Sequence, residues 1–288
     1  MHPDGVDGFQ AEGHLGVRRQ VAAVGRDDTS SSSKSVPVRS ACPVSTTTSE
    51  CTTVCPHREI FIARVMPWNY HYLHMATPSN LNEYTTAEHA LKYLARADRI
   101  PHRVEGEAVL LEFIPQSVGR ILDLGTGDGR LLALLRIERR DSEGVALDFS
   151  PTMLAAARAR FHGDDKVRVV EHNLDEPLGE LGRFDAIVSS FAIHHCADDR
   201  KRKLYAEIFA ALSPGGVFYN LEHVAPPTAG LHDRFLRALG ITEAEEDPSN
   251  KLVSVETQVQ WLREIGFQNV DCHWKWLELA LFGGNKSR

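Results

Sequence analysis

Strand-like and helix-like segments alternate along residues 85–288, and no other feature constrains the fold as strongly. Short apolar runs rich in β-branched residues are each followed by a helix-forming segment or, after the third run, by a loop. The predicted strands are residues 120–124, 144–148, 167–171, 184–190 and 214–224. Parallel strands need crossover connections, so this pattern predicts an α/β fold, a mostly parallel sheet with helices on both faces.

The two ends of this region differ from the alternating part. Two helices, 86–98 and 102–114, are predicted before the first strand, with Thr85 or Thr86 as the N-cap of the first. We expect them to form a lid, about 85–114, over the site. At the C-terminal end the helix-like "VETQVQWLREIGF" precedes "VDCHWK" and "WLELALF", two strand-like runs with so short a link that they must pair antiparallel.

Residues 1–65 have a different composition from the rest of the chain. Ser and Thr dominate between Thr29 and Thr53, and the apolar residues follow no strand or helix period, so we expect a disordered tail followed by one domain over 66–288. Translation could instead start at Met66 or Met75. The segment "CTTVCPH" resembles half of a zinc site, but no second ligand pair follows, so a linker is the favoured interpretation.

The stretch "ILDLGTGDGR" places three glycines on a strand-to-helix turn. Gly125, Gly127 and Gly129 let a ligand approach the backbone, and the N-terminus of the following helix favours an anionic group. The fingerprint for a dinucleotide pyrophosphate is G-x-G-x-x-G, whereas this turn reads G-x-G-x-G. A nicotinamide-dependent oxidoreductase is therefore the weaker alternative.

In an open parallel sheet, ligands bind beyond the carboxyl ends of the strands. Asp148 ends the second strand, where its carboxylate could accept hydrogen bonds from both hydroxyls of a ribose. Asn173 and the backbone of Leu174 follow the third strand and could read an adenine edge. Ser190 to His195 follow the fourth strand and face the reactive end. These positions predict a nucleoside site.

On these residues the chain resembles a class I S-adenosylmethionine-dependent methyltransferase over about 85–288. "LDLGTGDG", "ALDFSPTML", "FDAIVSSFAIHH" and "LSPGGVFYNLEH" resemble four motifs of that family, in its order and spacing. The resemblance implies a Rossmann-like seven-stranded sheet of order 3-2-1-4-5-7-6 with strand 7 antiparallel, and S-adenosyl-L-methionine as the cofactor. The expected cofactor-binding residues are Asp123, Gly125, Thr126, Gly127, Asp128, Gly129, Asp148, Phe149, Met153, Asn173, Leu174, Ser190 and Phe191.

Two further segments, "ARADRIPHRVEGEAVLLEF" and the C-terminal "SVETQVQWLREIGFQNVDCHWKWLELALFGG", resemble the tRNA wobble-uridine carboxymethyltransferases. A carboxylated cofactor would need a basic partner, for which Arg237 is the candidate. The basic run Arg200 to Lys203 is interpreted as a solvated helix face, with a nucleic-acid contact as the alternative. We favour a small-molecule acceptor, with tRNA as the alternative partner.

Catalysis by methyl transfer depends mainly on proximity, so few residues can be nominated. His195 is the candidate for orienting the acceptor or accepting its proton. The structural alternative, which is favoured, is that His194 packs under the loop and His195 hydrogen-bonds backbone. Glu222 and His223 are interpreted either as part of the acceptor pocket or as exposed loop residues. No metal site is expected. A non-catalytic module that binds the same cofactor stays open.

Composition sets the remaining expectations. The net charge of −7 disfavours a broadly basic nucleic-acid surface. No apolar run is long enough to cross a bilayer, and the five scattered cysteines form no disulfide framework, so we expect a cytoplasmic protein without membrane contact. A homodimer is left open.

Overall fold

The computed structural model describes residue 84 and residues 86–288. The helices in this part are α1 (Ala87–Ala97), α2 (Arg103–Phe113), α3 (Arg130–Glu138), α4 (Pro151–Arg160), α5 (Asp198–Ala211), α6 (Ala229–Leu239) and α7 (Val255–Ile265), with short 3₁₀ turns η2 (Ile193–His195) and η3 (Glu243–Glu245). The strands are β1 (Arg120–Leu124), β2 (Glu143–Asp148), β3 (Val167–Glu171), β4 (Phe184–Ser190), β5 (Leu212–His223), β6 (Gln268–Trp276) and β7 (Leu279–Asn285). The expected tail and the segment "CTTVCPH" lie outside the described residues.

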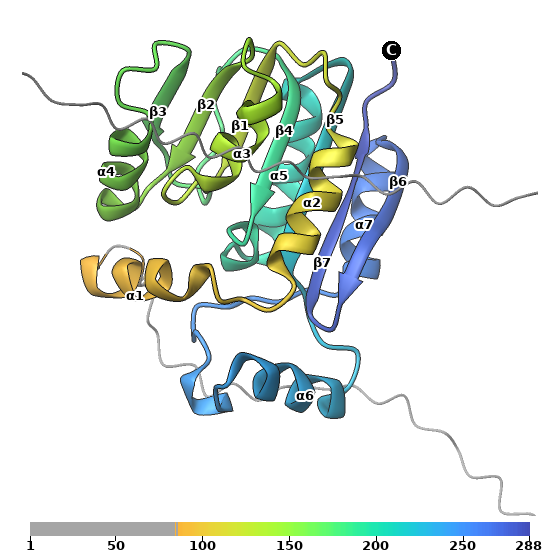
Figure 1. The fold of residues 1–288 in the computed structure, drawn as a ribbon. Coiled ribbons are helices and arrows are strands. Elements are labelled where there is room, and N and C mark those ends of the chain that lie inside the picture. Colours follow the sequence, from red (N-terminus) through yellow and green to blue (C-terminus); the bar gives the residue numbers. More distant parts are fainter. Residues whose placement is uncertain (1–83, 85) are drawn as a thin grey trace, which may run out of the picture. The chain divides into compact units, whose positions relative to one another are not determined.

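Within the described residues, the strands form one sheet of order β3-β2-β1-β4-β5-β7-β6. The first five strands pair in parallel, and β7 is antiparallel to both β5 and β6 (Figure 1). The predicted order and the antiparallel seventh strand are confirmed. The chain winds outward from β1 to β3 and then returns to β4 on the other side of β1. This reversal places the expected binding site beyond the carboxyl ends of β1 and β4.

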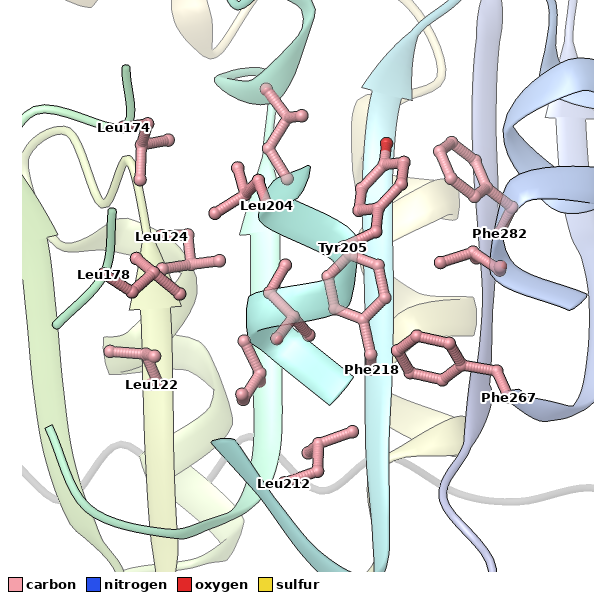
Figure 2. Close-up of a cluster of buried hydrophobic side chains, with 14 of the residues drawn as sticks. Leu122, Leu124, Leu174, Leu178, Leu204, Tyr205, Leu212, Phe218, Phe267 and Phe282 are labelled. Atoms are coloured by element: carbon pink, nitrogen blue, oxygen red, sulfur yellow. The ribbon is translucent and has the colours of Figure 1, made fainter. Parts of the chain in front are cut away.

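Both faces of the sheet are covered because its central strands are apolar on both sides. Leu122 and Leu124 of β1 pack with residues of α5 and α7 on one face, whereas Ile121 packs with α2 and α3 on the other. Figure 2 shows the first of these clusters, where Tyr205 of α5 lies beside Phe218 of β5. A strand buried on both faces reads as a continuous apolar run, which is why β1 and β4 were recognisable in the sequence.

The two helices predicted before the first strand, α1 and α2, lie at different positions relative to the sheet. α2 packs closely on β5 because Gly106 carries no side chain, and a Cβ there would lie 2.8 Å from Leu221 Cδ1. α1 lies beyond the carboxyl ends of the strands (Figure 1). Its N-cap is Thr86, whose hydroxyl accepts a hydrogen bond from the backbone N–H of His89. The segment that lies near the predicted site is therefore α1 rather than most of α2.

A helical segment between β5 and α7 was not predicted. It contains α6, which begins after the N-cap Thr228 and ends at Gly240 in the left-handed conformation, and it continues through η3 to Ser254. Figure 1 shows α6 beyond the same end of the sheet as α1. The connection from β5 thus adds residues to the end of the sheet where the predicted site lies.

Candidate functional site

The three glycines of the turn after β1 have three different surroundings, although all adopt positive φ angles. A Cβ on Gly125 would lie 2.1 Å from Ala192 Cβ, and one on Gly129 would lie 2.4 Å from the Phe161 ring. A Cβ on Gly127 would instead meet only Met153 Sδ, at 3.9 Å, within the pocket. Gly125 and Gly129 therefore permit close packing, and Gly127 leaves room for a ligand.

Asp148 at the end of β2 is held by the turn that it faces. Its two carboxylate oxygens accept hydrogen bonds from the backbone N–H groups of Gly127 and Ser150, each at 2.9 Å. Burial raises the pKa of Asp148, and these N–H donors oppose the rise. Each carboxylate oxygen has a second acceptor position, so Asp148 can still receive two hydroxyl donors. Two adjacent hydroxyl donors, as on a ribose, match this remaining capacity.

Asp123 at the end of β1 has one carboxylate oxygen without a partner. Oδ2 accepts a hydrogen bond from Thr126 Oγ1 at 2.6 Å, whereas the buried Oδ1 has no hydrogen-bond partner among the described residues. Burial raises the pKa of Asp123 to about 7. A buried carboxylate lacking a partner is costly unless a donor or cation arrives. The positively charged methionine part of the expected cofactor fits this need.

The predicted site residues gather around one pocket at the carboxyl ends of β1, β2 and β4. It contains about 1100 Å³ of empty space, part of it open to solvent. The pocket is lined by every predicted cofactor residue except Gly129, and also by His195. Gly129 is absent because it packs on Phe161. Asn173 lines the pocket; its side-chain oxygen accepts the N–H of Asp175, and its NH₂ group still offers two donors to a ligand.

Several lining residues were missed by the sequence analysis. They come mainly from α1 and from arginines on neighbouring helices, and include Tyr84, Tyr93, Leu94, Ala97, Asp98, Arg103, Arg130 and Arg160. Glu107 of α2 forms salt bridges with both Arg103 and Arg130, with Nε–Oε1 distances of 2.8 and 3.0 Å. The i, i+4 spacing of Arg103 and Glu107 was the one available signal, but it reports an ion pair and not a pocket.

The histidines after β4 differ in surroundings. His194 is buried, and its Nδ1 lies 2.5 Å from Oε1 of Glu222. Burial alone would raise the pKa of Glu222, but the charge and hydrogen bond of His194 hold that pKa below its ordinary value. His195 lines the pocket, and its Nδ1 lies 2.9 Å from the hydroxyl of Ser249. The N–H of His195 donates to the backbone carbonyl of Ala192, and the unpredicted segment after α6 adds a side-chain contact to the ring that the sequence analysis did not anticipate.

Glu222 and His223 do not line the pocket, and neither is an exposed loop residue. Glu222 is fully buried, and His223 Nε2 lies 3.1 Å from Glu278. Both alternatives proposed for this pair were wrong because β5 continues to His223 and β7 pairs with it. Arg237, the residue nominated for a carboxylated cofactor, is also not among the residues that line the pocket.

The basic run Arg200 to Lys203 is not a solvated face along its whole length. Arg200 donates to the backbone carbonyls of Leu174 and Glu176 and pairs with Glu207. Lys201 is 1% exposed and donates to the carbonyl of Lys251. Arg202 and Lys203 are exposed and pair with acids. The favoured interpretation as a solvated face is therefore wrong for Arg200 and Lys201, and the alternative of a nucleic-acid contact loses the same two cations because they have structural partners.

The described part of the chain contains no cluster of His, Cys, Asp or Glu suited to a metal ion. In the same part, no helix is both long and apolar enough to cross a membrane.

Comparison with known proteins finds similarity to S-adenosylmethionine-dependent enzymes. A model of a methyltransferase domain matches residues 121–216. The chain is 30% identical over 172 residues to the demethylmenaquinone methyltransferase of Clavibacter sepedonicus, covering 54% of this chain and 69% of that protein. It is 25% identical over 194 residues to the carboxy-S-adenosyl-L-methionine synthase of Photobacterium profundum, covering 61% of this chain and 78% of that protein.

Among solved structures, an O-methyltransferase family protein from Burkholderia thailandensis superposes with a TM-score of 0.57 at 19% identity. The match covers 71% of this chain but only 62% of the length of that protein. At this identity the likeness concerns the fold alone.

Proposed function

The chain belongs to the S-adenosylmethionine-dependent methyltransferases, and from this premise we propose that it methylates a small organic acceptor held between the turn after β1 and helix α1. The observation that carries this proposal is the continuity of one pocket from Asp148 to Tyr84, Tyr93 and Leu94. An apolar and aromatic wall beside a polar cofactor site is typical of small-molecule pockets. The demethylmenaquinone methyltransferase, by its name, acts on such a molecule.

The cofactor would occupy the polar side of the pocket. Asp148 would hold the ribose hydroxyls, and Asp123 with the backbone at Gly127 would hold the charged methionine part. Phe149, Met153 and the backbone near Leu174 would contact the adenine. Ser190 and Phe191 would lie toward the reactive centre. When bound, S-adenosylmethionine supplies a methyl group that is already activated by its sulfonium.

The protein's own contribution is then to orient the acceptor, exclude water and receive a proton where one is released. Phe191 has a φ angle of 54°, and its N–H donates to the carbonyl of Leu221, so its backbone conformation is fixed. We assign the proton-accepting role to His195, which lines the pocket beside this residue. Helix α1 would act as the lid because it supplies the wall opposite the strand ends.

A tRNA acceptor is the second candidate, supported by the resemblance of the C-terminal segment to wobble-uridine enzymes and by the similarity to a carboxy-S-adenosyl-L-methionine synthase. An RNA acceptor needs several phosphate contacts. Arg200 and Lys201 are committed to internal carbonyls, which is why we place this candidate below a small molecule.

The experiment that tests this proposal offers both acceptor classes to the protein. The full chain is incubated with methyl-labelled cofactor and either total tRNA or a metabolite extract. We expect label in a low-molecular-weight product. Label in tRNA, with transfer that weakens steeply as salt rises, would make RNA the acceptor. Tight cofactor binding without transfer to either would support a non-catalytic module.

We also propose the cytoplasm as the compartment. The chain has an odd number of cysteines, and Cys196 and Cys272 are both free thiols, as is usual in a reducing environment.

A further inference from the structure

The loop between η3 and α7 places two polar side chains in line with His195. Asp247 Oδ1 accepts hydrogen bonds from both the hydroxyl of Ser249, at 2.6 Å, and its backbone N–H, at 2.9 Å. The hydroxyl oxygen of Ser249 lies 2.9 Å from Nδ1 of His195. Asp247 also pairs with His89 of α1, with an Nε2–Oδ2 distance of 3.2 Å, so this loop is anchored to the lid helix.

The hydrogen bonds of the Ser249 hydroxyl decide the tautomer of His195. A serine hydroxyl has one proton, and Ser249 uses it to donate a hydrogen bond to the carboxylate of Asp247. Toward His195 the same oxygen can then only accept, so Nδ1 of the imidazole must carry the proton. In a neutral ring the other nitrogen, Nε2, is then an acceptor.

Nε2 is the nitrogen of the His195 ring that is left without a hydrogen bond. It is buried and has no hydrogen-bond partner among the described residues, and His195 is one of the residues that line the pocket. The ring is enclosed by Tyr84, at 5.1 Å between ring centroids, and by His194, at 4.0 Å. Burial lowers the pKa of His195, and the charge of His194 lowers that pKa further, against the opposing charge of Asp247. The ring is therefore neutral near pH 7.

We propose that Asp247 and Ser249 are positioning residues that hold His195 in the Nδ1–H tautomer, so that Nε2 serves as the base for an acceptor whose methylated atom is a hydroxyl oxygen. This proposal rests on the proposed function and adds the acceptor's chemical class. The hydroxyl proton moves to Nε2 while the acceptor oxygen forms a bond to the methyl carbon and the methyl–sulfur bond breaks. S-adenosylhomocysteine leaves, and the imidazolium returns its proton to water. A thiolate or a neutral amine would not require this arrangement.

The first test measures the tautomer directly and needs no acceptor. The ¹⁵N-histidine spectrum of the full chain is recorded with S-adenosylhomocysteine bound, and the His195 signals are identified from their loss in His195→Gln. We expect a protonated Nδ1 and an unprotonated Nε2. Ser249→Ala should give averaged tautomers, and Ser249→Thr should restore the wild-type pattern. A protonated Nε2 in the wild type would overturn the proposal, as would a spectrum of Ser249→Ala identical to that of the wild type.

The matched control is Thr242→Ala, which removes the capping box of η3 in the same segment without touching His195. It should leave the tautomer unchanged. If it alters the tautomer as Ser249→Ala does, loosening of the loop is sufficient and the positioning role is wrong.

The second test identifies the methylated atom. Products from the metabolite extract, made with ¹³C-methyl cofactor, are read by the chemical shift of the new methyl group. A methyl on oxygen is expected, with the product's rate of formation reduced about tenfold by Ser249→Ala and at least a hundredfold by His195→Gln, consistent with the usual worth of a general base. A methyl on sulfur, nitrogen or carbon would overturn the hydroxyl assignment. Absence of cofactor binding would contradict the proposed function instead, which separates the two failures.

Discussion

The two halves of the pocket are built by different means. The half assigned to the cofactor consists of the ends of paired strands and the turn after β1, which a hydrogen bond from the backbone N–H of Gly127 to Asp148 ties to β2. The half assigned to the acceptor comes from α1, η2 and the segment after α6, which are joined by side-chain contacts such as His89–Asp247 and Ser249–His195. From this difference we infer that cofactor binding depends on the strand ends and the turn, whereas the choice of acceptor depends on the attached segments.

The largest effect is expected where the two halves touch. Gly125→Ala adds a Cβ that meets Ala192 at 2.1 Å on a backbone with φ of 64°, so both the turn and the loop after β4 must shift. We expect a loss of several kcal/mol in the free energy of unfolding, on the order of 3 or more, and at least hundredfold weaker binding of S-adenosylhomocysteine.

Gly163→Ala is the matched control for this substitution, because Gly163 has a φ of 80° and no neighbour within 4 Å of an added Cβ. It should cost only the backbone strain, about 1 kcal/mol. Equal losses in denaturant titrations of the two variants would contradict the packing role of Gly125.

The second effect concerns the cofactor half alone. Asp148→Ala removes a carboxylate that can receive two hydroxyl donors, and we expect a loss of about 2 to 4 kcal/mol in cofactor binding. Calorimetry should show at least a tenfold rise in Kd, with the domain still folded. Glu171→Ala is the control, since Glu171 ends the neighbouring strand opposite Asp148 and does not line the pocket. Equal Kd values for wild type and Asp148→Ala would place the ribose elsewhere.

A smaller effect, with opposite signs for stability and binding, is expected at Asp123. Its folded pKa of about 7 lies above the unfolded value of 3.8, so the folded state binds more protons and stability falls as pH rises between these values. Asp123→Asn removes this penalty, and we expect about 1 to 3 kcal/mol more stability at pH 8. The same change should weaken cofactor binding. Melting at pH 4 and pH 8 checks the sign, and a variant less stable at pH 8 would refute it.

The smallest effect should come from the exposed cations of α5. Arg202→Glu and Lys203→Glu break only surface ion pairs, each worth about 0 to 1 kcal/mol. We expect transfer of label to the low-molecular-weight product to change by less than twofold. A strong loss of transfer into tRNA on these changes would instead favour the RNA acceptor.

The sequence predicted the turn and the strand ends that line the pocket because their backbone geometry restricts which residue types can occupy them. Left-handed positions select glycine at 125, 127 and 129, and an acid at 148 follows a run of buried apolar residues. The same periodicity predicted the order of the sheet only together with the family resemblance, since pairing between strands is not local.

The segments that form the acceptor half show weaker patterns in the sequence. Thr228 and Gly240 bracket α6 as cap residues, and this pattern could have been found. The contact between Ser249 and His195 joins residues 54 apart in the chain, and Arg200 is held by the backbone carbonyl of Leu174, which is 26 residues away. No local pattern reports such contacts. For this reason the basic run was interpreted as solvated, and Glu222 was interpreted either as a pocket residue or as an exposed loop residue.

The central claim is that the pocket at the carboxyl ends of β1, β2 and β4 binds S-adenosylmethionine through the turn at Gly125 to Gly129 and the carboxylate of Asp148. The most direct measurement is calorimetric titration of the full chain with S-adenosylhomocysteine and, in parallel, with NAD. We predict saturable binding of S-adenosylhomocysteine at one site, lost in large part in Asp148→Ala, and no heat of binding with NAD. Saturable NAD binding without a response to S-adenosylhomocysteine would contradict the account.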